Sequence, residues 1–140
     1  MAHRGAADEH ERVTDLAGGL KDLALREHVA VVAVSAVDHQ GIQARRVRLR
    51  DLRGSTALAH ECDVALLLND KLAVVSKVHT AYDLSRIPEL RHVAVLSVEK
   101  HREGTAGIDL EFRKQFPTFR FDPDGCFTVD HLVDDLVFES

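Results

Sequence analysis

The sequence predicts an α/β domain in which helices accompany a mixed sheet that ends in an antiparallel β-hairpin. Apolar residues recur at helical spacing between positions 13 and 24, and a continuous apolar run, "HVAVVAVSAV", follows at 28–37. A helix that leads into a buried strand is typical of the α/β class. Farther along the chain, two apolar segments at 92–99 and 108–113 flank a glycine-bearing turn, which predicts the hairpin.

The composition fits one ordinary globular domain. Apolar residues make up 45% of the 140 residues and charged residues 29%. The net charge of −5 argues against general coating of nucleic acid or membrane, although a local basic strip is still compatible with it. The chain has only Cys62 and Cys126, no apolar run of the roughly 18 residues that span a bilayer, and a polar N-terminus. We therefore expect reduced thiols, no membrane contact and a cytoplasmic location.

We expect residues 1–10 to form a flexible N-terminus and residues 11–140 to form one domain. The apolar stripe of the first helix consists of Val13, Leu16, Leu20, Leu23 and Ala24. Gly18 and Gly19 interrupt this helix at a cost of about 1 kcal/mol each, unless a neighbour packs close to them. The run at 28–37 is rich in β-branched residues, so it predicts a strand that is buried on both faces.

The middle of the chain alternates between polar loops and further candidate strands. Residues 38–56 form a polar loop, and "DVALLLND" from Asp63 predicts a second buried strand. "KLAVVSKV", at 71–78, is a candidate third strand. The stretch at 81–91 is expected to be irregular, because Pro88 prevents a long helix.

The last third of the chain is dominated by the hairpin. Its strands, 92–99 and 108–113, are joined around Gly104 and Gly107 by a loop that is longer than the tight two-residue type. "TFRFD" adds a short strand, and "TVDHLVDDLVFE" predicts a closing helix. The apolar face of that helix would consist of Leu132, Val133, Leu136 and Val137.

The polar loop at 38–56 is strongly basic. Its arginines are Arg45, Arg46, Arg48, Arg50 and Arg53. Beside them, "RGST" offers a glycine and two hydroxyls, so backbone N–H groups and side chains could both reach phosphate oxygens. The alternative is a solvated charged loop. The position after a predicted buried strand favours a binding role, since ligands of open α/β sheets lie beyond the carboxyl ends of the strands.

Lys100 and Arg102 form a second basic group, where a strand enters the hairpin turn. Residues at i and i+2 of an extended segment point the same way, so these two side chains could grip one anion, such as a polyphosphate. An arginine held out on a rigid hairpin is typical of an arginine finger. The alternative is a pair of turn residues that only keep the turn soluble.

Other chemistries have weak support in the sequence. The spacings of His60 with Cys62 and of Cys126 with His131 do not match a structural zinc site, so we predict no metal site. "HRE" at 101–103 lacks the P-C-x-x-C of zinc deaminases, and Ser35 lies outside any G-x-S-x-G elbow. Neither G-x-x-x-x-G-K-[ST] nor G-x-G-x-x-G occurs in the sequence. We therefore expect no complete nucleotide site in this chain.

Taken in order, three segments resemble the C-terminal motor domain of DnaB-type replicative DNA helicases, a hexameric branch of the RecA-like ATPases. "GLKDLALREHVAVVAVSAV" resembles the helix and sensor strand of that family, "RDLRGSTALAHECDVALLLND" its D-L-R-x-S segment and next strand, and "VEKHREGTAGIDLEF" its K-x-R hairpin. The resemblance covers about residues 16–122. It implies a partial RecA-like sheet, a role in ATP-dependent DNA unwinding within a larger assembly, and ATP and Mg²⁺ as cofactors.

The resemblance also implies site residues and partners. Lys100 and Arg102 correspond to the finger pair, which acts in trans on the γ-phosphate held by the adjacent subunit. Arg53, Gly54 and Ser55, together with the neighbouring Arg50, correspond to the loop that follows single-stranded DNA. The implied partners are single-stranded DNA and either further copies of this chain or a separate N-terminal ATPase half.

The sequence departs from the family pattern at three places. The family has its phosphate-binding loop and its Mg²⁺-holding acidic residue upstream of residue 16, where we expect no room for them. Ser35-Ala36-Val37 stands where the family has S-Q-L, and Gly54 stands where it has a glutamate. We therefore expect the chain alone to be inactive.

These departures leave other interpretations open. One alternative is a degenerate, non-catalytic module that binds nucleic acid or protein, and a third interpretation, a small metalloprotein or hydrolase, rests on scattered histidines alone. Half of a doubly wound sheet would also expose a strand edge, which predicts dimerisation or pairing with an N-terminal polypeptide.

Overall fold

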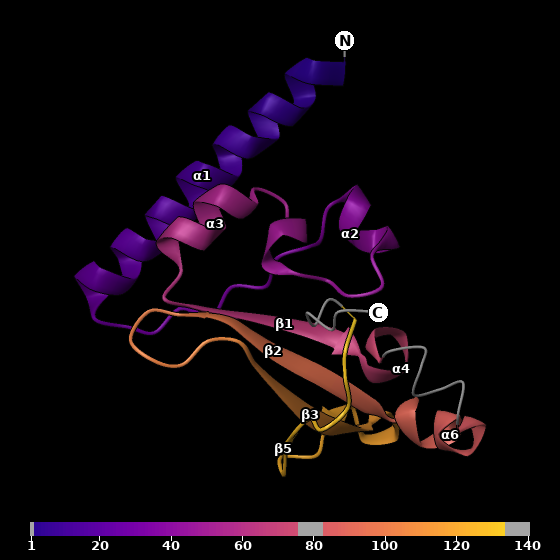
Figure 1. Ribbon diagram of the computed structural model, residues 1–140. Helices are drawn as coiled ribbons and strands as arrows, with labels where there is room; N and C mark the ends of the chain where they lie inside the picture. The colour runs from indigo at the N-terminus through magenta and orange to yellow at the C-terminus, as the bar shows by residue number, and fades with distance from the viewer. Residues whose placement is uncertain (1, 76–82, 134–140) are drawn as a thin grey trace.

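The computed structural model describes residues 2–75 and 83–133, and in it an antiparallel sheet lies below a group of helices (Figure 1). The strand order is β1-β2-β3-β4, and β5 pairs with β3. The strands are β1 (Val64–Asp70), β2 (Val93–His101), β3 (Ile108–Gln115), β4 (Arg120–Phe121) and β5 (Cys126–Phe127). The described helices are α1 (Ala2–Glu27), α2 (His39–Gln43), α3 (Ser55–Glu61), α4 (Lys71–Val74) and α6 (Ile87–Leu90), and the 3₁₀ turns are η1 (Leu49–Asp51), η2 (Leu84–Arg86) and η3 (Phe116–Thr118).

The predicted α/β class and the predicted hairpin are confirmed. β2 and β3 pair antiparallel, with Leu96 opposite Leu110. Gly107 closes the turn with a positive φ of 75°, and its N–H donates to Val98 O at 2.7 Å. The left-handed backbone at this position explains why the turn carries a glycine. The short strand predicted in "TFRFD" is also present, as β4.

The second predicted strand is present as β1, but it is buried on only one face. Its residues alternate strictly between exposed and buried, and Leu66 and Leu68 are exposed. β1 pairs only with β2 among the described strands, so it is an edge strand of an antiparallel sheet rather than a central parallel strand. One-sided burial is usual for antiparallel sheets.

The prediction of a strand at 28–37 is wrong. Residues 29–36 are irregular and exposed, and only Val37 makes an isolated bridge, to Leu52. An apolar run becomes a strand only when another strand supplies its hydrogen bonds, and no described strand pairs with this one. At its start, His28 turns the chain out of α1 with a φ of 53°.

The candidate strand at 71–78 is wrong for the residues that the structure describes. Residues 71–74 form a single helical turn, α4. The Asp70 side chain accepts a hydrogen bond from Leu72 N at 3.0 Å, which begins the helix directly after β1. Residues 76–78 lie outside the described residues. The irregular stretch around Pro88 forms two short helical turns, η2 and α6, and α6 has its proline in the first turn.

The closing helix predicted at 128–139 falls partly outside the described residues, which end at 133. Residues 128–133 are not helical, and Leu132 instead makes an isolated bridge with Val75. Leu132, Val74 and Val95 form the most deeply buried apolar cluster. The C-terminal segment therefore contributes to the core through an extended contact.

α1 begins at Ala2, before the predicted apolar stripe, and it lies beside α3 in Figure 1. Its buried position is Ala17, whereas Leu16, Leu20 and Leu23 are exposed. The predicted helix is confirmed, but only Val13 and Ala24 of the predicted stripe are half-buried, because the small α3 covers only a narrow part of the helix. None of the described helices is both long and apolar enough to cross a membrane.

Candidate nucleotide and nucleic-acid contacts

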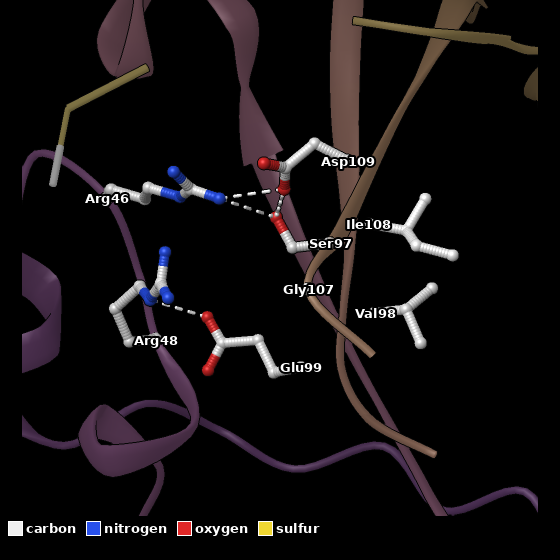
Figure 2. Close-up of a pocket in the computed structure, with 8 residues that line it drawn as sticks. All are labelled: Arg46, Arg48, Ser97, Val98, Glu99, Gly107, Ile108 and Asp109. Carbon is white, nitrogen blue, oxygen red and sulfur yellow. Dashed lines mark hydrogen bonds and ion pairs between the residues drawn. The ribbon is translucent and has the colours of Figure 1, made fainter. Parts of the chain in front are cut away.

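Two arginines of the basic loop are attached to the sheet rather than presented to solvent. Figure 2 shows them beside a pocket of about 170 Å³ between the loop and the ends of β2 and β3. Arg46 is buried, and its Nη2 donates to Asp109 Oδ1 at 2.7 Å and to Ser97 Oγ at 3.3 Å. Arg48 Nε lies 2.6 Å from Glu99 Oε1, as an ion pair without good hydrogen-bond direction. These carboxylates neutralise the two arginines, so the pocket offers no net positive charge for a phosphate.

Arg45 has a similar anchoring role at the start of the loop. Its Nη2 donates to Val75 O at 3.2 Å and to Ala73 O at 3.3 Å, which fixes the loop to the end of α4. Charge-assisted bonds to carbonyl oxygens stabilise the segment without involving a ligand. Three of the five loop arginines thus stabilise the fold, and for them the interpretation as phosphate-binding residues has no support in their contacts.

Arg50 and Arg53 are two loop arginines whose side chains reach solvent, 76% and 53% exposed. Arg50 Nε lies 3.9 Å from Asp51 Oδ1, a contact that is long for a hydrogen bond. Arg53 Nη1 donates to Glu9 Oε1 of α1 at 3.1 Å, also in solvent. Both side chains remain available to an incoming phosphate at small cost, because exposed ion pairs contribute only about 0–1 kcal/mol.

Gly54, predicted as part of the DNA loop, has a structural reason to be glycine. Its φ is 66°, and a Cβ at this position would lie 2.3 Å from Val13 Cγ1 of α1. No side chain fits there without moving α1. Ser55, the other predicted DNA-loop residue, is the first residue of α3. The short helix α3 thus leads from the predicted DNA loop to β1.

Lys100 and Arg102 point the same way, as predicted, and both reach the C-terminal end of α3. Lys100 Nζ donates to Ala59 O and, at 3.4 Å, to His60 O, and Arg102 Nη2 donates to His60 O at 3.0 Å. Cations are favoured at this end of a helix, where carbonyl groups lack partners. The two side chains are outside the core, with Arg102 exposed and Lys100 half-buried. Their present ligands are oxygen atoms of the same chain.

Asp63 is the carboxylate that holds this cationic rim together. It accepts from Lys21 Nζ at 2.7 Å and pairs with Arg102 Nη1 at 3.0 Å. The hydrogen bond from Lys21 is the largest cause that lowers the pKa of Asp63, and the positive charges of Arg102 and Lys100 add to it. α1, the start of β1 and the hairpin turn therefore meet at one ionised side chain.

A second charged cluster, which was not predicted from the sequence, lies on the inner face of the sheet. Lys71 is fully buried, and its Nζ contacts Glu111 Oε1, Asp130 Oδ2 at 3.0 Å and Thr128 Oγ1 at 2.8 Å. Arg86 also binds Asp130, with two bonds of 3.0 and 3.1 Å. The predicted strand at 71–78 includes Lys71, and only its position directly after Asp70, a helix-capping residue, indicates a helix.

The pKa of Asp130 reflects this environment. The hydrogen bonds from Arg86 are the largest cause that lowers it from 3.8 to about 2, and the bond from Lys71 adds to the effect, while burial opposes it. The cluster is internally paired, and it joins α4, β3 and the C-terminal segment. We assign it a role in stability.

These observations define a class of protein: an α/β domain with an exposed pair of basic residues on a loop and another on a hairpin. The chain matches the family model described as the DnaB-like helicase C terminal domain over residues 1–121, so it belongs to this family. The predicted resemblance is confirmed. No curated protein and no solved structure matches the chain.

The family implies dependence on ATP and Mg²⁺, but the described residues do not fit these cofactors. Within residues 2–75 and 83–133, no group of three or more His, Cys, Asp or Glu side chains could hold a metal ion. The pocket of Figure 2 is lined by arginines that already bind carboxylates. No chemical step at a nucleotide is therefore assigned to this chain alone.

Proposed function

We propose that the chain acts as part of a DnaB-type helicase motor, in which it supplies Lys100 and Arg102 to a nucleotide held by a neighbouring subunit. The observation that best supports this role is the convergence of the two side chains on His60 O at the rim of the sheet, outside the core. A phosphoryl group offers ionised oxygens in place of neutral carbonyl oxygens, and charge-assisted bonds are roughly twice as strong.

The proposed step needs only an exchange of partners. Arg102 would leave His60 O and its exposed ion pair with Asp63, and its guanidinium would face the transferring phosphoryl group. The exposed carboxylate loses little when Arg102 leaves, since Lys21 still donates to it at 2.7 Å. The positive charge then stabilises the charge that develops on the phosphate in the transition state.

The exposed loop residues have a matching proposed role on single-stranded DNA. Arg50 and Arg53 would contact phosphates, and Gly54 and Ser55 would bring the backbone close to the strand. Support comes from the exposure of the two arginines and from their position at the start of α3. Such contacts carry affinity without sequence preference.

The nucleotide role can be tested on the native assembly, isolated through an affinity tag on this chain. Arg102→Ala should lower the ATPase rate of that assembly by about 10³–10⁵, since this is the usual contribution of an arginine finger. Arg120→Ala is the matched control, because Arg120 is also exposed but lies on β4. An unchanged rate in Arg102→Ala, or an assembly without ATPase activity, would refute the role.

A second candidate function is a non-catalytic interaction module. It is favoured by Gly54, which packs against Val13 where the family carries a glutamate, and by the internal bonds of Lys100 and Arg102. Binding to single-stranded DNA is expected of a helicase motor and of a module that binds nucleic acid, but not of a module that binds only protein. Several phosphate contacts would give a steep dependence of affinity on salt.

A further inference from the structure

The apolar run at residues 29–36 is unusual for a segment without a sheet partner. Every residue of the run is exposed, and Val32 and Val34 are 93% and 99% exposed. Its ends are fixed: Val29 N donates to Ala24 O at 3.1 Å, and Ala36 O accepts from Arg53 N at 3.3 Å. Between these ends, no backbone N–H of residues 30–35 donates to another described residue. Figure 1 draws the run as a thin trace between α1 and α2.

The free edge of β1 is the complementary feature. β1 pairs with β2 on one side, and no described strand pairs with its other side. Natural edge strands are usually protected by lysine, proline or a covering element. β1, "VALLLND", has neither lysine nor proline and carries a charge only at Asp70. Its other exposed side chains, Val64, Leu66 and Leu68, are all apolar.

We propose that the two features meet in a symmetric dimer, in which residues 29–36 of each copy add as a strand to the β1 edge of the other. One copy has one strand to give and one edge to receive, so a twofold axis satisfies both at once and closes the assembly. In the structure, the run forms no ladder with its own β1. A second copy therefore supplies both an edge for the run and a strand for the free edge of β1.

Charge and pattern favour this contact over others between two copies. Each chain carries a net charge of −5, which opposes association in general, but residues 29–36 and 64–69 contain no charged residue. Side chains alternate along a strand, so Val32 and Val34 lie on the same face. Placed on the face of Leu68, they extend an apolar row that crosses the sheet through pairs of opposed residues, namely Leu68, Leu96, Leu110 and Phe127.

Light scattering coupled to size exclusion, over a range of concentrations, tests the dimer on the full chain. We expect a dimer whose dissociation constant rises about 100-fold or more in Val32→Lys/Val34→Lys, because two lysines would be buried against Leu66 and Leu68. The two valines are solvent-exposed in one copy, so the variant should keep its circular dichroism spectrum. Val129→Lys is the matched control, since Val129 is 92% exposed but lies outside the run.

Hydrogen exchange identifies the contact. The amides of residues 30–36 and 64–70 should be protected in the dimer and should lose protection together on dilution. Protection that persists in a monomer would mean that the run pairs with its own β1, and an unprotected monomer would mean that another protein covers the edge. Either result overturns the proposal, as does a dimer that Val32→Lys/Val34→Lys leaves unchanged. The inference does not rest on the proposed nucleotide and DNA contacts.

Discussion

Two groups of cations in this domain have opposite properties: those on the inner face of the sheet and those at the rim formed by α3 and the hairpin turn. On the inner face, Lys71 and Arg46 are buried and bind carboxylates. At the rim, Arg102 is exposed and binds a backbone carbonyl and an exposed aspartate. A buried cation cannot leave its partner without leaving an unpaired charge in the core, whereas an exposed cation can exchange partners. The rim is therefore the region suited to a ligand.

The removal of Lys71 should have the largest effect on stability of the variants that test this difference. Lys71→Met leaves the carboxylates of Glu111 and Asp130 without their shared cation inside the protein, and we expect a loss of about 3–5 kcal/mol in the free energy of unfolding. Urea denaturation followed by circular dichroism measures it. Arg102→Ala is the comparison at the rim, and its loss should stay below about 1 kcal/mol. Similar losses in the two variants would remove the distinction.

A second variant checks the cause. In Lys71→Met, Asp130 still binds Arg86, so Glu111 is the carboxylate left without a cation. Lys71→Met/Glu111→Gln removes that charge as well, so part of the lost stability should return. If the double variant is less stable than Lys71→Met, the cost does not come from an unpaired carboxylate.

The next effect is the pH dependence that Asp130 gives to stability. Its pKa is about 2 in the folded protein, below the ordinary value of 3.8. A lowered folded pKa gives stability that is present above pH 3.8 and is lost as the pH falls through about 2. The contribution is roughly 2 kcal/mol. Unfolding free energies measured by urea between about pH 2 and 7 should show this loss, and Asp130→Asn should flatten it.

Asp63 provides the comparison at the rim. Its pKa is also lowered, first by the hydrogen bond from Lys21, but its side chain is exposed. Solvent screens such pairs, so Asp63→Asn should leave most of the acid dependence in place. If Asp63→Asn flattens the profile as much as Asp130→Asn does, the inner cluster is not its main source.

The sequence predicted the elements that depend on local patterns. The hairpin of β2 and β3, the strand β1 and the first helix were all found, because glycine turns, apolar alternation and helical spacing act within a few residues. The family was also found, from three motifs in order. The same-side orientation of Lys100 and Arg102 followed from the two-residue repeat of a strand.

What the sequence did not predict depends on distant partners. The run at 28–37 has the pattern of a buried strand, but it needs a neighbouring strand that the described residues do not supply. The roles within the basic loop differ for the same reason. Arg46 is buried because Asp109, on β3, lies beneath it, whereas Arg50 has no such carboxylate below it. Loop composition alone cannot separate the two.

The smallest expected effect is on the affinity for DNA. It tests whether the exposed arginines of the basic loop differ in role from the buried ones. If Arg50 contacts a phosphate, Arg50→Ala should reduce the slope of log K against log salt by about 0.7 for a fluorescent single-stranded oligothymidine. Its stability should not change, because the side chain is 76% exposed and has only a 3.9 Å contact with Asp51. Arg120→Ala removes another exposed charge, from β4, and should leave the slope nearly unchanged. Equal reductions in both variants would mean that DNA responds to net charge alone, and the basic loop would then have no defined nucleic-acid contact.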